Sequence, residues 1–97
     1  MNKKEKNQKM KNVRSLIDRV DEKILPLMVK RSILVNKALE LKSRKNEIID
    51  RKRINQILKN ISNKSIKNGI DPKITKRIWR AIIWSYVDYQ RRNFKKK

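Results

Sequence analysis

The chain has 97 residues, with 29 lysines and arginines against 9 acidic residues, and a formal net charge of +20 at pH 7. Such a length makes one small domain. The absence of cysteine and histidine excludes disulfides, thiol nucleophiles, imidazole acid–base catalysis and the usual zinc ligands. No run approaches the roughly 20 apolar residues of a membrane span, and residues 1–12 lack the apolar core of a signal peptide. We therefore expect a cytoplasmic protein that is neither membrane-bound nor metal-dependent.

The positive charge by itself points to nucleic acid. We expect residues 1–12 to be a disordered basic tail, residues 13–92 to form the domain, and residues 93–97 to be a second basic tail. Within the domain the cations are spread around all the expected helices, and no recognised DNA- or RNA-binding motif is present. A basic helical nucleic-acid-binding module is therefore only a remote alternative.

A long amphipathic helix is expected from residue 13 to residue 42, because apolar residues recur there at three- and four-residue steps. These residues are Val13, Leu16, Ile17, Val20, Ile24, Leu27, Met28, Leu34, Val35 and Ala38. The period continues in phase through Pro26, which predicts a kink but not a break. Such a helix would span about 45 Å, whereas a compact monomer of this length is roughly 30 to 35 Å across. Covering the helix requires a second chain, which predicts an intertwined homodimer.

Two cations interrupt the apolar face of this helix. At about 100° per residue, Arg31 and Lys42 fall within roughly 20° of each other. A charge on a core-facing stripe is costly unless it is paired or faces an anion. Each could reach the edge of the core or pair with a carboxylate, but two on one line favour the floor of an anion-binding pocket. Arg14 lies about 100° off that line and would face a different neighbour.

Two further helices are expected after a short polar connection from 43 to 49. Asp50 can cap the second helix, which runs to about Lys67, and Arg53 lies at the edge of its apolar stripe. That stripe consists of Ile54, Ile57, Leu58, Ile61 and Ile66.

Strong end signals separate the second helix from the third. Asn68-Gly69 ends one helix and Asp71-Pro72 starts the next, which continues to about Arg92. Gln90 falls on its inner side and needs a partner there. The other inward residues are Trp79, Ile82, Ile83, Tyr86 and Val87, whose aromatic members are expected to be core and not a stacking platform for bases.

Three helices, one of them overlong, with these polar residues directed inward, resemble the all-helical class of chorismate mutases and the related isochorismate pyruvate lyases. The resemblance extends from Val13 to Gln90 through VRSLIDRVDEKI, the spacing R-x10-K, DRKR, NGIDPKI and IWRAIIWSYVDYQ. It implies an all-α fold and an intertwined homodimer, with two active sites that each bind a small dicarboxylate. It also implies that each site is completed by an arginine of the other chain.

The resemblance also implies roles for single residues. Arg31 and the partner's Arg14 would grip the two substrate carboxylates, and Arg53 would line the polar wall. Lys42 and Gln90 would hydrogen-bond the enolpyruvyl ether oxygen. Because chorismate rearranges to prephenate in a unimolecular pericyclic step, the resemblance implies no nucleophile, metal or cofactor.

Two positions depart from the pattern of many mutases. Ile54 stands where they have a glutamate, and Tyr86 stands where they have a small hydroxyl residue. Both changes resemble the lyase branch, in which the same pocket eliminates pyruvate from isochorismate and leaves salicylate. We expect a chorismate mutase of aromatic amino-acid (Phe/Tyr) biosynthesis, with isochorismate pyruvate lyase as the alternative.

Overall fold

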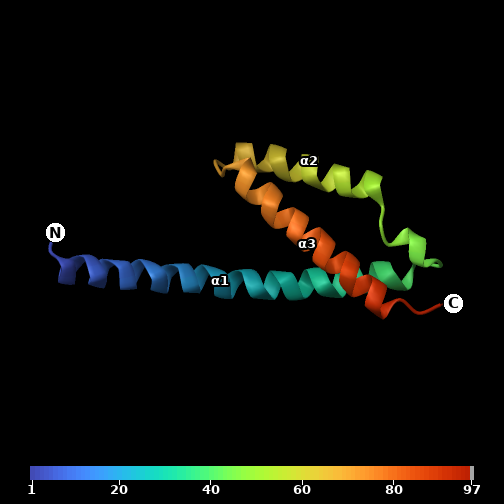
Figure 1. Ribbon diagram of the computed structural model, residues 1–97, viewed down its shortest axis with the longest axis horizontal. Helices are drawn as coiled ribbons and strands as arrows, with labels where there is room; N and C mark the ends of the chain where they lie inside the picture. The colour runs from blue at the N-terminus through green and yellow to red at the C-terminus, as the bar shows by residue number, and fades with distance from the viewer. Residues whose placement is uncertain (97) are drawn as a thin grey trace. The chain divides into compact units, whose positions relative to one another are not determined.

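The computed structural model describes residues 1–96, which form α-helices and one 3₁₀ helix and contain no strand. The elements are α1 (Lys3–Glu40), η1 (Lys45–Glu47), α2 (Arg51–Lys67) and α3 (Pro72–Asn93), as Figure 1 shows. The expected all-α fold with an overlong first helix is thereby confirmed. The chain divides into two compact units, Met1–Leu34 and the part from Val35 onward, and each is described by itself.

The first helix begins earlier than expected, so the prediction of a disordered tail over residues 1–12 is wrong. Asn2 caps α1, because its side-chain oxygen accepts from the backbone N–H of Glu5 at 2.8 Å and its amide donates to the Glu5 carboxylate at 3.1 Å. This reciprocal pair differs from a capping box in that the Glu5 carboxylate accepts from the Asn2 side chain and not from its backbone N–H. The following turns are rich in lysine, and lysine, glutamate and glutamine are good helix formers. High charge in this segment is therefore compatible with helix.

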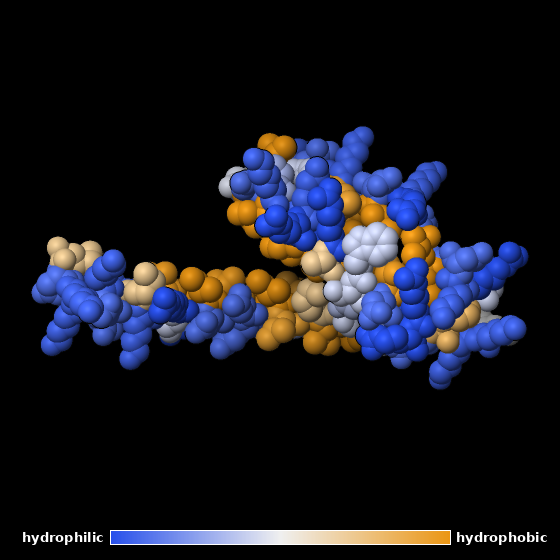
Figure 2. All heavy atoms as spheres, viewed as in Figure 1, coloured by the Kyte–Doolittle hydropathy of each residue, from blue (hydrophilic) through white to orange (hydrophobic). Residues whose placement is uncertain are grey.

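The apolar face of α1 is uncovered over most of the first unit. No residue of Met1–Leu34 is buried, and Figure 2 shows hydrophobic side chains along this part of α1. The exposed members of the expected stripe are Val13, Leu16, Ile17, Val20, Ile24, Leu27 and Leu34. The helix continues through Pro26 without a break; the kink expected there stays a prediction.

The second unit contains the hydrophobic core. Its buried residues are Leu39, Ile48, Ile83 and Val87, and partly buried Ile49, Ile54, Ile57, Leu58 and Phe94 pack against them. Two segments contribute more than expected. The connection from 43 to 49 was predicted to be polar, but its 3₁₀ turn ends in Ile48, which is buried. Residues 93–97 were expected to be a tail outside the domain, but Phe94 packs on the core.

The ends of α2 and α3 confirm the expected caps. The Asp50 side chain accepts from the backbone N–H of Arg53 at 3.0 Å, and Asp71 accepts from that of Lys73 at 2.9 Å. At the end of α2, Gly69 has φ +74°, the left-handed conformation that glycine adopts without strain. These local signals fix the hairpin in which α2 packs against α3.

The apolar side of α2 differs from the prediction at one position. Ile66 was expected to point inward but is 66% exposed, whereas Ser65 is 5% exposed. Ser65 Oγ donates to the Ile61 carbonyl at 2.6 Å and lies 2.6 Å from Thr75 Oγ1. Thr75 Oγ1 also reaches the Pro72 carbonyl at 3.4 Å, and either hydroxyl can be the donor in the bond between Ser65 and Thr75. A satisfied pair of hydroxyls therefore joins α2 to α3 next to their turn.

Candidate active site

Lys42 and Gln90 meet in the second unit, although 48 residues separate them in sequence. Lys42 follows the end of α1, and its Nζ donates to Gln90 Oε1 at 2.6 Å. Gln90 is on α3 and is 7% exposed, and its Nε2 donates to the Tyr86 carbonyl at 3.2 Å. Two hydrogens on the ammonium and one on the amide stay available for a ligand. Gln90 was expected to need a partner, and Lys42 provides it.

The surroundings of Lys42 act on its charge in opposite directions. Burial lowers the pKa of the Lys42 ammonium below its ordinary value, and the nearby carboxylates of Asp50 and Glu47 counteract part of that change. Within residues 1–96, Lys42 forms no ion pair with either carboxylate. The ammonium is thus partly desolvated and bonded to a neutral amide, an arrangement that favours interaction with an incoming anion.

Arg53 and Ile54 begin α2 but lie in different environments. Arg53 is exposed, and its guanidinium donates to Gln56 Oε1 at 3.0 Å. Ile54 is half-buried and packs against the hydrophobic core. The structure shows no hydrogen bond from Arg53 to Lys42 or Gln90 among residues 1–96. In the single chain, Arg53 therefore remains at the surface.

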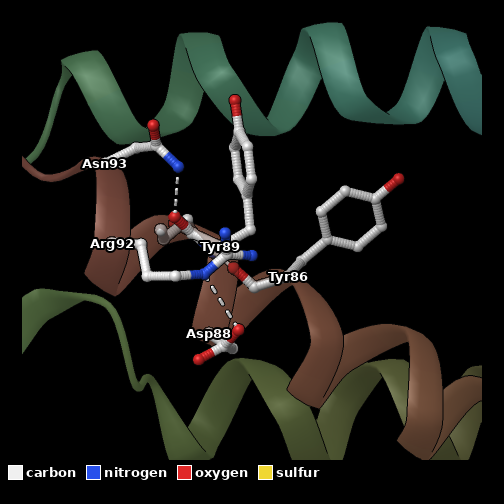
Figure 3. Close-up of polar contacts among 6 residues, drawn as sticks. Tyr86, Asp88, Tyr89, Arg92 and Asn93 are labelled. Atoms are coloured by element: carbon white, nitrogen blue, oxygen red, sulfur yellow. Dashed lines mark hydrogen bonds and ion pairs between the residues drawn. The ribbon is translucent and has the colours of Figure 1, made fainter.

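Two tyrosines, Tyr86 and Tyr89, precede Gln90 on α3, and Figure 3 shows both of their rings. Tyr86 lies one turn before Gln90 and is half-buried, and its ring meets that of Tyr89 edge to face, with centroids 6.5 Å apart and an interplanar angle of 81°. The Tyr89 hydroxyl donates to Asn36 Oδ1 at 2.8 Å. Figure 3 shows the Tyr89 ring directed toward α1. This bond ties α3 to the last turns of α1, immediately beside the contact between Lys42 and Gln90.

The two candidate-site arginines of α1, Arg14 and Arg31, belong to the first unit. Arg14 is exposed and Arg31 is half-buried. Lys42, Arg53 and Gln90 belong to the second unit, as do Ile54 and Tyr86. The contacts described for the candidate site are therefore those among the residues of the second unit.

Two acidic residues near Lys42 were not anticipated as part of the site. Asp50 was recognised only as a helix cap, and Glu47 only as part of a polar connection. In the structure, Glu47 Oε2 accepts from the backbone N–H of Ser43 at 2.8 Å. A carboxylate in the connection between two helices is a weak signal, because many such residues are simply solvated.

The arrangement can stabilise negative charge on a bound molecule. A partly desolvated ammonium and a buried amide converge, and such donors are effective where charge develops during a reaction. Among the residues that the structure describes, no three Asp or Glu side chains gather into a metal-binding cluster. In the same part of the chain, no helix is long and apolar enough to cross a bilayer.

Comparison with known proteins gives one match. A model of the family described as chorismate mutase type II matches residues 13–91. No curated protein and no solved structure matches the chain. The matched range includes every residue of the candidate site, from Arg14 to Gln90.

Proposed function

The chain belongs to the chorismate mutase type II family, and we propose that it is a chorismate mutase, which converts chorismate to prephenate in aromatic amino-acid biosynthesis in the cytoplasm. The observation that carries this proposal is the contact of Lys42 Nζ with Gln90 Oε1 at 2.6 Å. This contact brings the Lys42 ammonium next to the Gln90 amide and so supports a site in which both groups donate to one oxygen atom of a bound substrate.

In the proposed reaction the ether C–O bond breaks while a C–C bond forms within the same molecule. No group enters or leaves, so the reaction needs no nucleophile, base or cofactor. Negative charge grows on the ether oxygen, and Lys42 and Gln90 would donate to that atom. Holding the substrate in the reactive conformer lowers the barrier further by reducing the entropy that must be lost.

The substrate carboxylates need cations, and two arginines are proposed for this role, with a third in the wall of the pocket. Arg31 and the partner's Arg14 would bind the two carboxylates, and Arg53 would line the polar wall. Arg53 now makes one exposed hydrogen bond to Gln56. Because this bond is exposed to water, which can replace it, its exchange for a charged ligand is inexpensive.

We also propose that the enzyme is a homodimer, since the uncovered apolar face of α1 supports association with a second copy. Val20, at the middle of that face, is 55% exposed in the single chain. A contiguous apolar surface of this kind marks an interaction site in a soluble protein. In a dimer formed through α1, Arg14 would be available to the site of the other chain.

Isochorismate pyruvate lyase is the second candidate, and Ile54 and Tyr86 favour it. Ile54 packs on the core and offers no carboxylate for a substrate hydroxyl. Tyr86 places a half-buried ring one turn before Gln90. The side chains at positions 54 and 86 therefore suit a substrate whose hydroxyl is not hydrogen-bonded by a carboxylate of the protein.

The test is a paired assay of the purified full chain on chorismate and isochorismate, following prephenate and salicylate separately. Prephenate alone, at an enzyme-like kcat/KM, would support the mutase. Dominant salicylate would replace it with the lyase. The absence of both products would refute both activities and leave a binding module, for which salt-sensitive nucleic-acid affinity is the next measurement.

A further inference from the structure

We propose that Glu47 is a positioning residue for Lys42, acting through the turn that carries the lysine and through its negative charge. The inference rests on the proposed function, because it assumes that the charged form of Lys42 is the active one. The contact that carries it is the bond from the Ser43 backbone N–H to Glu47 Oε2, at 2.8 Å.

The bond links the end of α1 to η1, whose own backbone bonds run from the N–H groups of Glu47 and Ile48 to the carbonyls of Arg44 and Lys45. Beyond the end of α1, the backbone N–H of Lys42 still reaches the Leu39 carbonyl at 3.1 Å. The next N–H, that of Ser43, is bonded to the Glu47 carboxylate instead of a helical carbonyl. Glu47 in turn precedes Ile48, which is 5% exposed and belongs to the core. Lys42 is therefore held between two buried anchors, Leu39 and Ile48, with Glu47 closing the segment between them.

The charges that act on Lys42 come from two elements. Glu47 in η1 and Asp50 at the cap of α2 attract the ammonium, and Gln90 on α3 is neutral. Asp50 also caps α2 through the Arg53 N–H, so its removal would disturb that helix. The Glu47 charge can be removed more cleanly, because glutamine at this position keeps an oxygen that can accept from Ser43.

Two substitutions separate the charge of Glu47 from its hydrogen bond. Glu47→Gln should lower the pKa of Lys42, since burial then acts against less attraction, and should move the alkaline limb of kcat/KM to lower pH. Glu47→Ala should also reduce kcat by about threefold to tenfold at all pH values, the range of one net hydrogen bond. A purely structural role for Glu47, through its bond with Ser43, would lower the stability of Glu47→Ala and leave the alkaline limb of both variants at its wild-type position.

A charge-matched control is available on α3. Asp88 is exposed and pairs with Arg92 at 3.1 Å, and it is not among the groups that act on Lys42. Asp88→Asn changes the net charge as much as Glu47→Gln does. It should therefore leave the alkaline limb where it is in the wild type.

The decisive measurement is an NMR titration of the Lys42 side chain in the full-length wild type, Glu47→Gln and Asp88→Asn, alongside the pH dependence of kcat/KM. A lower titration midpoint in Glu47→Gln alone would support the inference. An unchanged midpoint in Glu47→Gln, or an equal change in Asp88→Asn, would overturn it. If the wild type forms no prephenate, the proposed function fails, and the titration still decides whether Glu47 acts on Lys42.

Discussion

Replacing Lys42 with methionine removes the ammonium and retains a side chain of similar length. In the wild type, Nζ lies 2.6 Å from Gln90 Oε1, so the substitution removes the donor that is best placed for the ether oxygen. One preorganised donor is worth about 10² to 10³ in rate, or about 2.7–4 kcal/mol. We expect kcat/KM for chorismate to fall by at least about 10²-fold, measured as steady-state formation of prephenate.

The stability of the Lys42→Met variant should change much less than its activity. The substitution leaves a buried Gln90 oxygen without its donor, at about 1–3 kcal/mol, and it also relieves the desolvation of a charged group. Thermal unfolding followed by circular dichroism should show a folded protein. Lys37→Met is the control, because Lys37 is exposed on α1, and it should retain activity. Wild-type kcat/KM in Lys42→Met, or an equal loss in Lys37→Met, would refute the reasoning.

Three further substitutions test other parts of the structure. Gln90→Glu should lose about 10²-fold in kcat/KM at neutral pH, because an ionised carboxylate cannot donate a hydrogen bond to the ether oxygen. Activity should return as the pH falls and the carboxylate is protonated. A pH–rate profile like that of the wild type would contradict this. Thr75→Val removes the hydroxyl that bonds to Ser65 and should cost about 1–3 kcal/mol in urea unfolding with kcat unchanged, whereas an unchanged midpoint would mean that the bond contributes nothing. Val20→Glu should give an inactive monomer in analytical ultracentrifugation. Val29→Glu is a matched control, because Val29 is 59% exposed against 55% for Val20 and lies about 180° away on α1. Equal effects of Val20→Glu and Val29→Glu would argue against a dimer through the predicted face.

The ends of α2 and α3 could be predicted because their signals are local. Asp50, Gly69 and the pair Asp71-Pro72 act on backbone groups within a few residues, and no distant part of the chain is needed to interpret them. The start of α1 at Lys3 differs from the prediction because the high density of lysine in residues 1–12 indicates disorder when it is considered alone. The capping residues Asn2 and Glu5 are a local signal for helix in the same segment. Ser65 was missed because its burial depends on the hydroxyl of Thr75, which the periodicity of α2 alone does not show.

The candidate site was predicted in part. Periodicity indicated that Lys42 and Gln90 both point inward, and the structure shows that they are in contact. The influence of Glu47 on Lys42 could not be anticipated, because it depends on the path of a turn between helices. Arg53 is exposed in the single chain, and its predicted role remains a proposal, as do those of Arg14 and Arg31.

The division of α1 between a buried end and an uncovered end affects how the protein should respond to dilution. The part from Val35 onward has its own core, so in the proposed dimer we expect its folding to be unimolecular and independent of protein concentration. The segment Met1–Leu34 has no buried residue, and in the proposed dimer its order comes from the second copy, which makes that order subject to mass action. At high dilution the segment carrying Arg14 would separate from its partner and lose helix, while the hairpin of α2 and α3 would persist. The turnover rate per chain would then fall as the enzyme is diluted, even with substrate in excess.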